Sequence, residues 1–234
     1  MIVKKEWNSP LSEGGIAIVG LPGIANTGRI AALTIMDQIK YQRVMDIYSI
    51  DMPPRVLLFD GVLEPPRVFI VEDPDARIVV VSGNYQPLSP TGQYELSAEI
   101  AKILVERHKV KMVIALAAEG TQSIKERKIK IATTHKEMLE MFPGAEPFAK
   151  RSITGANALI PTIAGTIYSI PSACLLATSE ADSIADYKAS ALLVSELVKV
   201  LKWPYKPEHA RKVAQSIIRE MNIVEKKVDY IIAE

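Results

Sequence analysis

The segment best suited to chemistry is the glycine-rich stretch of residues 20–32, GLPGIANTGRIAA. It follows the apolar run of residues 16–19 and leads into a segment rich in Ala, Ile and Leu, an order typical of strand, turn and helix. The amides of such a turn and the positive end of the helix behind it can bind a phosphate. The first question is therefore whether this turn holds a nucleotide.

The spacing of the glycines does not fit either common nucleotide-binding turn. Gly20, Gly23 and Gly28 follow the pattern Gly-x-x-Gly-x-x-x-x-Gly, whereas a dinucleotide fingerprint is Gly-x-Gly-x-x-Gly and a Walker loop ends in Lys followed by Ser or Thr. In one interpretation the turn is structural: Gly23 takes a positive φ, and Gly28 packs closely. Asn26 and Thr27 then cap the helix. In the other, the helix end binds an anion or another ligand. The spacing itself predicts no binding of ATP or of a nicotinamide dinucleotide.

Polar residues that follow the predicted strands are the remaining candidates for a ligand site. Ligands of a parallel sheet bind outside the carboxyl ends of its strands, so these residues are expected to meet at one edge. The pocket candidates are Gly23, Asn26, Asn84, Glu119 and Asn157. Three acidic residues further on, Glu180, Asp182 and Asp186, fit equally well as solvated loop residues or helix caps.

No residue is assigned a catalytic or metal-binding role. The three histidines, His108, His135 and His209, are far apart, and none has the spacing of a metal ligand. There is no Gly-x-Ser-x-Gly elbow, and the single cysteine, Cys174, lies in an apolar run typical of a buried, inert thiol. We therefore expect no metal and no cofactor.

The elements that position these residues alternate as in an α/β protein. Strands are predicted at residues 16–21, 44–50, 55–60, 68–72, 77–82, 111–118 and 172–178, and helices at 26–40, 92–108, 136–141, 156–168, 186–201 and from 207 onward. Several strands are apolar without alternation, which indicates a mostly parallel sheet with helices on both faces, in three layers. Between residues 44 and 81 the strands come without helices, which predicts hairpins or an antiparallel extension.

The chain is expected to form one α/β domain over residues 1–206 and a helical carboxyl-terminal segment over residues 207–234 that serves as an assembly arm. Pro207 suits a first helical turn. Apolar residues then recur in steps of three and four, close to the period of a helix that packs along another helix. The contact candidates for a partner or a second copy are Met221, Val224, Val228, Tyr230 and Ile231.

Composition narrows the class of partner. A formal net charge of +1 creates no general field for nucleic acid or anionic lipid. No apolar run approaches the roughly 18 residues that span a bilayer, and the first residues lack the apolar core of a signal peptide. The sequence predicts a cytoplasmic protein that binds neither nucleic acid nor membrane.

The order of the sequence blocks resembles the second proteasome assembly chaperone family, which is found in archaea, actinobacteria and eukaryotes. The blocks are GLPGIANTGRIAA, VVVSGNYQPLSPTGQYELSAEIAKIL, VIALAAEG, ITGANALIPTIA and ACLLATSEADSIADYKASALLVSELVKVL. The resemblance implies a core related in topology to nucleoside phosphorylases, a homo-oligomer, and ATP-independent assembly of the α ring of the 20S proteasome. Family members that dock on the proteasome often end in hydrophobic-Tyr-any residue, whereas Tyr230 is too far from the end of this sequence. Docking through another surface and a different role both stay open.

Three functions are compatible with these features of the sequence. The leading one is a non-enzymatic, oligomeric assembly chaperone that binds proteasome α subunits. The second is a small-molecule-binding enzyme or sensor with its pocket at the carboxyl ends of the strands. The third is a scaffold whose partner is unrelated to proteasomes.

Overall fold

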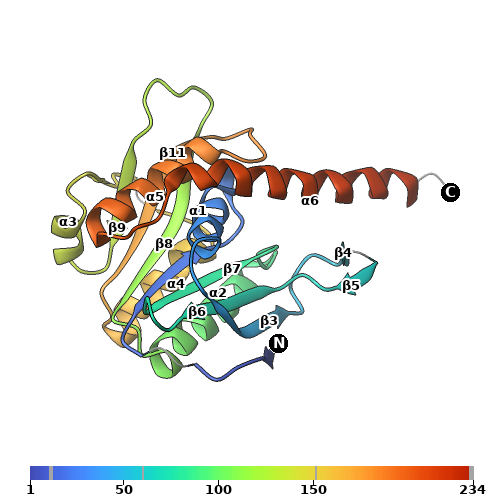
Figure 1. The fold of residues 1–234 in the computed structure, drawn as a ribbon, viewed down its shortest axis with the longest axis horizontal. Helices are drawn as coiled ribbons and strands as arrows, with labels where there is room; N and C mark the ends of the chain where they lie inside the picture. Colours follow the sequence, from blue (N-terminus) through green and yellow to red (C-terminus); the bar gives the residue numbers. More distant parts are fainter. Residues whose placement is uncertain (11–12, 60, 151, 232–234) are drawn as a thin grey trace.

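A nine-stranded mixed sheet forms the centre of the molecule (Figure 1). The computed structural model describes residues 1–10, 13–59, 61–150 and 152–231; for Phe59 and residues 222–231 the description covers the backbone alone. In spatial order the strands are β1 (Ile2–Glu6), β3 (Gln42–Ser49), β6 (Val68–Asp73), β7 (Ile78–Gly83), β2 (Ile16–Gly20), β8 (Met112–Thr121), β11 (Ser172–Glu180), β9 (Ile129–Thr133) and β10 (Glu146–Pro147).

The core of this sheet is parallel, and its flanks are antiparallel. β7, β2, β8 and β11 run parallel to one another, and Ile18 of β2 lies between Val80 of β7 and Ile114 of β8. On one side β7, β6, β3 and β1 pair antiparallel, which is the extension expected between residues 44 and 81. On the other side β9 pairs antiparallel with β11 and parallel with β10. The sheet is therefore mixed around a parallel centre.

Helices cover both faces of the sheet, so the expected three-layer α/β architecture is confirmed. Alternate residues of the central strands point to opposite faces. One face packs against α2 (Pro90–Lys102) and α4 (Ala156–Tyr168), the other against α1 (Thr27–Met36), α3 (Glu137–Met141) and α5 (Tyr187–Leu201). Neighbouring residues of β8 show the division: Ala115 belongs to the first core and Leu116 to the second. The helix α2 continues into the turn η2 (Ile103–Arg107).

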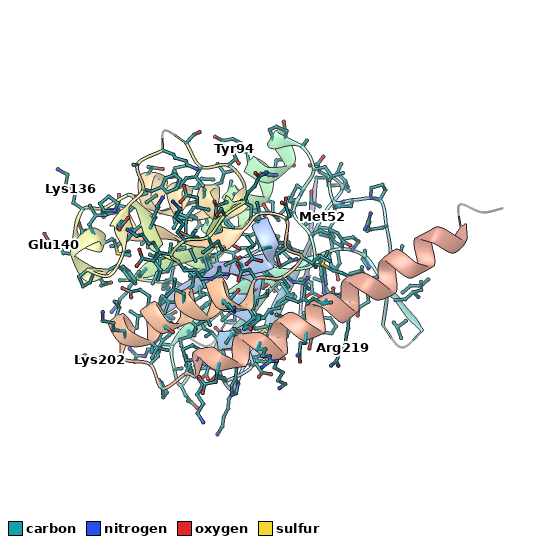
Figure 2. All side chains as sticks on the ribbon, turned by 90° about the horizontal axis from the view of Figure 1, so that it is seen from above. Met52, Tyr94, Lys136, Glu140, Lys202 and Arg219 are labelled. Carbon is teal, nitrogen blue, oxygen red and sulfur yellow. The ribbon has the colours of Figure 1, made fainter. Side chains whose placement is uncertain are left out.

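A long helix, α6 (Ala210–Ile231), follows the short turn η3 (Pro207–His209). Its first half packs against α1 and α5 through the buried residues Val213, Ala214 and Ile217. Its second half extends beyond the rest of the molecule in both views, and Figure 2 places Arg219 near the point where it leaves. We call residues 222–231 the α6 arm.

A separate two-stranded hairpin projects from the same end of the molecule (Figure 1). It consists of β4 (Leu57–Phe59) and β5 (Val62–Glu64), and Leu58 lies opposite Leu63 in its register. Leu57 is buried at its base, whereas Leu58 and Leu63 are exposed. The hairpin is thus anchored at one end and presents an apolar surface at the other.

Candidate functional site

The expected ligand-binding edge of the sheet contains a small pocket of about 230 Å³. Gly23, Gly155 and Asn157 line it, together with Gln86 and the end of β8 at Ala117 and Ala118. Two of the five pocket candidates, Gly23 and Asn157, therefore line this pocket. The other three, Asn26, Asn84 and Glu119, do not line it and lie elsewhere at this edge of the sheet. Whether the pocket binds a ligand stays a prediction.

Two amide side chains hold the walls of this pocket together. Asn157 accepts a hydrogen bond from the backbone N–H of Leu21 and donates one to the Leu21 carbonyl oxygen, both at 2.9 Å. Gln86 donates to the carbonyl oxygen of Pro22 and accepts from the N–H of Ala156 at 2.9 Å. These contacts tie the turn after β2 to the amino-terminal end of α4. Both side chains therefore serve the fold of the pocket.

The glycine turn differs from its predicted conformation. Gly23 is extended, with φ −166°, and the positive φ angles fall on Ala25 and Asn26, at 48° and 49°. The left-handed region costs an ordinary residue about 1 kcal/mol or more, and Asn tolerates it better than most. Nearby backbone groups hold the conformation, because the N–H of Asp186 donates to the Ala25 carbonyl oxygen at 2.9 Å.

Capping of α1 by Asn26 is also wrong, because its side chain makes no hydrogen bond to the helix. Instead, Asn26 Nδ2 donates to the carbonyl oxygen of Ile184 at 3.0 Å and lies 3.6 Å from Met221 Sδ. Met221, a candidate for contact with a partner, is thus half-buried against its own chain. The side chains of the other four candidates, Val224, Val228, Tyr230 and Ile231, lie outside the described residues.

Asn84 also contacts α6. Its Nδ2 donates to Glu220 Oε1 at 3.3 Å, and the same carboxylate accepts from Arg29 Nη2 of α1, at 3.2 Å and 2.9 Å to its two oxygens. The Arg29 side chain is only 8% exposed and that of Glu220 is 24% exposed. We call Arg29, Asn84 and Glu220 the α6 latch. It fixes the last turn of α6 before the arm.

Glu119 is held by two lysines. Its carboxylate lies 2.5 Å from Lys130 Nζ and 2.8 Å from Lys150 Nζ. The hydrogen bonds from these ammonium groups lower the pKa of Glu119, so it is ionised at neutral pH and a poor general base. The arrangement links β8 to β9 and to the segment after β10.

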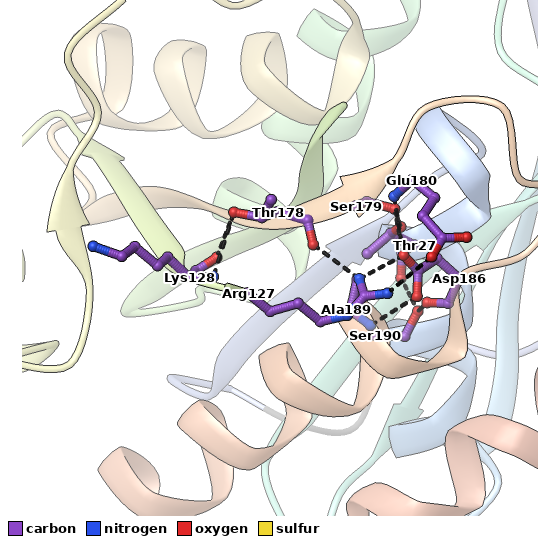
Figure 3. A network of polar contacts seen from close by, with 9 residues as sticks. All are labelled: Thr27, Arg127, Lys128, Thr178, Ser179, Glu180, Asp186, Ala189 and Ser190. Carbon is purple, nitrogen blue, oxygen red and sulfur yellow. Dashed lines mark hydrogen bonds and ion pairs between the residues drawn. The ribbon is translucent and has the colours of Figure 1, made fainter. Parts of the chain in front are cut away.

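Asp186 is the centre of a polar network at the end of β11 (Figure 3). It caps α5 by accepting from the N–H of Ala189 at 3.1 Å, as expected for a capping residue. Its other oxygen accepts from Arg127 Nη1 at 2.6 Å, from Ser179 Oγ at 3.1 Å and from the N–H of Glu180 at 3.1 Å. The network fastens the segment before β9 to α5 and β11.

We expect Asp186→Asn to destabilise the protein by about 1.5–3 kcal/mol at pH 7, the usual contribution of hydrogen bonds to a charged group. Asparagine caps a helix about as well as aspartate, so the loss comes mainly from Arg127, which keeps only the Glu180 carboxylate, 3.6 Å from its Nη2. Burial raises the pKa of Asp186, but the hydrogen bonds from Ala189 and Glu180 and the charge of Arg127 outweigh it and hold the pKa below its ordinary value. The stabilisation by Asp186 is therefore present above the unfolded-state pKa of about 3.9 and is lost as the pH falls below it.

Urea denaturation of Asp186→Asn and of the unchanged protein at pH 7 and pH 3 measures this difference. The gap in unfolding free energy should shrink at pH 3. The exposed neighbour Asp182 supplies the control, Asp182→Asn, which should have little effect. A gap that is equal at both pH values contradicts the role of the ionised carboxylate.

The chemistry available at this edge is that of contacts between chain segments. The described residues include no group of three His, Cys, Asp or Glu side chains that could hold a metal ion. Cys174 lies in β11 as predicted, and burial raises the pKa of its thiol to about 12, which makes it a poor nucleophile. Within the ranges described above, no helix is both long and apolar enough to cross a membrane.

Similar proteins were found by sequence and by structure. An uncharacterized protein of Methanocaldococcus jannaschii is 33% identical over 200 residues, which cover 82% of this chain and 76% of the relative. Among solved structures, PbaB of Pyrococcus furiosus, an archaeal proteasome activator, has a TM-score of 0.79 at 22% identity, over 96% of this chain and 98% of that one.

A second Pyrococcus furiosus structure, PbaA, an archaeal homolog of proteasome-assembly chaperone, has a TM-score of 0.78 at 23% identity, over 99% of both chains. At these identities the two structures establish the shared fold. The sequence profile of the PAC2 family matches residues 17–225, which is most of the chain and spans both the pocket and the α6 latch. The chain therefore belongs to the PAC2 family.

Proposed function

We propose that this protein is a cytoplasmic, homo-oligomeric assembly chaperone that binds proteasome α subunits and needs no ATP. The observation that carries the proposal is the α6 arm. A helix of 22 residues packs on its own chain through its first half and then continues beyond the core. An isolated helical segment without packing is marginal in water, so a second surface is needed to stabilise the arm.

The comparisons support the proteasome as the partner. The family match covers most of the chain, and two structures of the same fold are described as an archaeal proteasome activator and an archaeal homolog of proteasome-assembly chaperone. The site supports a binding role over catalysis, because Asn26, Asn84 and Asp186 all hold chain segments together.

Deletion of residues 223–234 should lower the oligomeric mass and leave a folded core. The core is expected to survive because Val213, Ala214 and Ile217, which pack on α1 and α5, all precede the deletion. Light scattering gives the mass, and circular dichroism checks the fold. An unchanged mass contradicts the role of the arm in self-association.

The identity of the partner is tested with the full chain and with the variant that lacks residues 223–234. Each carries an affinity tag at the amino terminus and is returned to an extract of its native cells, and bound proteins are identified by mass spectrometry. Recovery of proteasome α subunits by the full chain supports the proposal. Their absence from the full chain contradicts the proteasome as partner and favours a scaffold for other proteins.

A further inference from the structure

The hairpin of β4 and β5 presents an apolar surface that its own chain does not cover. Four apolar side chains on or beside it are exposed: Val56 by 57%, Leu58 by 43%, Val62 by 61% and Leu63 by 70%. Leu58 and Leu63 are cross-strand partners, so their side chains share one face, whereas Val62, the residue before Leu63, points to the opposite face. Grouped apolar exposure of this kind marks a contact surface more often than single exposed residues do.

The hairpin is built to hold this surface away from the main sheet. Its base is anchored by Leu57, which is 2% exposed, and by an ion pair between Glu64 and Arg67. Arg67 Nε in turn lies 3.7 Å from Asp46 of β3. Because a two-stranded hairpin by itself is marginally stable in water, its exposed end gains most from a cover.

The described part of this chain supplies no cover for the hairpin. The α6 arm lies at the same end of the molecule as the hairpin in both views (Figures 1 and 2). The four apolar residues of the hairpin are nevertheless exposed with the arm in place. Since α6 is one continuous helix whose first half is fixed by the α6 latch, the arm cannot bend back onto its own hairpin without breaking the helix. Each chain therefore carries an uncovered helix and an uncovered apolar hairpin at one end.

We propose that the β4–β5 hairpin is the docking surface for the α6 arm of a second copy of this chain. A two-fold interface is self-complementary, so one chain must carry both contacting surfaces, and this end of the molecule does. The arm supplies apolar residues in the sequence, Val224, Val228 and Ile231, whose steps of four and three are the spacing of one apolar stripe along a helix, the kind of stripe that packs on an apolar surface of a partner. The inference rests on the self-association proposed above and names the contact that produces it.

Cross-linking between two differently labelled chains tests the contact. One chain carries Leu63→Cys and the other, labelled with ¹⁵N, carries Val228→Cys; the two are mixed, allowed to exchange subunits and treated with a short bismaleimide. The native Cys174 is buried and its pKa of about 12 makes it unreactive under these conditions. We expect a 63–228 link between a labelled and an unlabelled chain.

A matched control comes from α4 on the other face of the sheet. Ile167 is 69% exposed, almost the same as Leu63 at 70%. Ile167→Cys mixed with the labelled Val228→Cys chain should give no link.

A second measurement compares the affinity of self-association. Leu63→Ser should raise the dissociation constant about tenfold, as loss of one apolar anchor does, while Ile167→Ser leaves it unchanged.

The outcomes separate this inference from the proposed function. An oligomeric protein without the 63–228 link overturns the inference and leaves the chaperone proposal standing. A monomeric protein at all concentrations contradicts self-association itself. If Leu63→Ser leaves the mass unchanged but abolishes recovery of proteasome α subunits, the hairpin faces the proteasome and the inference is wrong.

Discussion

Gly28→Ala is expected to destabilise the protein by about 3 kcal/mol or more, a large part of the roughly 5–15 kcal/mol by which a typical domain is stable. A Cβ at this position would lie 1.9 Å from the carbonyl oxygen and 2.7 Å from the carbonyl carbon of Leu116 in β8. These are backbone atoms of a central strand and cannot move aside. Alanine stabilises a helix relative to glycine by only about 1 kcal/mol. The clash outweighs this gain, so the net effect of Gly28→Ala is to lower the free energy of unfolding.

Gly20 of β2 makes a second close contact, with Gly28 of α1. A Cβ there would lie 2.2 Å from the carbonyl oxygen of Gly28, so α1 approaches both β2 and β8 too closely for any side chain. The close packing predicted at Gly28 is therefore present. It places α1 where Arg29 can reach Glu220 of α6.

Gly23→Ala is the matched control within the same turn. Gly23 is extended, and a Cβ there would meet only Asn157 Nδ2, at an ordinary 3.8 Å. We expect an unfolding free energy within about 0.5 kcal/mol of that of the unchanged protein. Thermal denaturation of the three proteins, with the soluble folded fraction as the readout if Gly28→Ala fails to fold, makes the comparison. Equal stability of the two variants contradicts the close approach of α1 to β8.

The central strands and main helices could be predicted because their signals are local. The helix α4 was predicted at its observed bounds, 156–168, from the glycine before it and its apolar run. The strands β1 and β9 were missed: β1 is mostly exposed and is rich in lysine, and β9 adjoins a charged patch. Both form through pairing with distant strands, β3 and β11, which a local pattern does not record.

For the candidate site, too, a local sequence pattern does not record contacts between distant segments. The rule that polar residues gather at the carboxyl ends of parallel strands predicts that Asn26, Asn84 and Glu119 line one pocket, whereas the pocket found at this edge is lined by other residues. Their roles could not be predicted, because each depends on a partner fixed only by the complete fold. Arg29 and Glu220, for example, are 191 positions apart in the sequence. Gln86 was passed over although it lies in one of the sequence blocks, since a glutamine in a loop gives no distinct signal.

The α6 latch is the contact whose loss should most affect the arm. Arg29 is almost fully buried, its Nε has no hydrogen-bond partner among the described residues, and the Glu220 carboxylate accepts from its Nη2. Removing one member of a buried ion pair is costly because the other charge stays buried without compensation, whereas replacing both by apolar residues is often neutral. The latch therefore makes a single substitution far more damaging than a double one.

We expect Glu220→Ala to lower the unfolding free energy by about 2–3 kcal/mol, less than for a fully buried pair because Glu220 is 24% exposed, and to release α6 from α1. The double variant Arg29→Leu with Glu220→Leu should recover most of the loss. The exposed Glu208 just before α6 gives the control, Glu208→Ala, which should change little. Hydrogen exchange measures the release directly: amides around Val213 and Ile217 should lose protection in Glu220→Ala and regain it in the double variant. If Glu220→Ala and Glu208→Ala exchange alike, the ion pair does not hold the helix, and the direction of the arm must be set by the apolar contacts of Val213 and Ile217 alone.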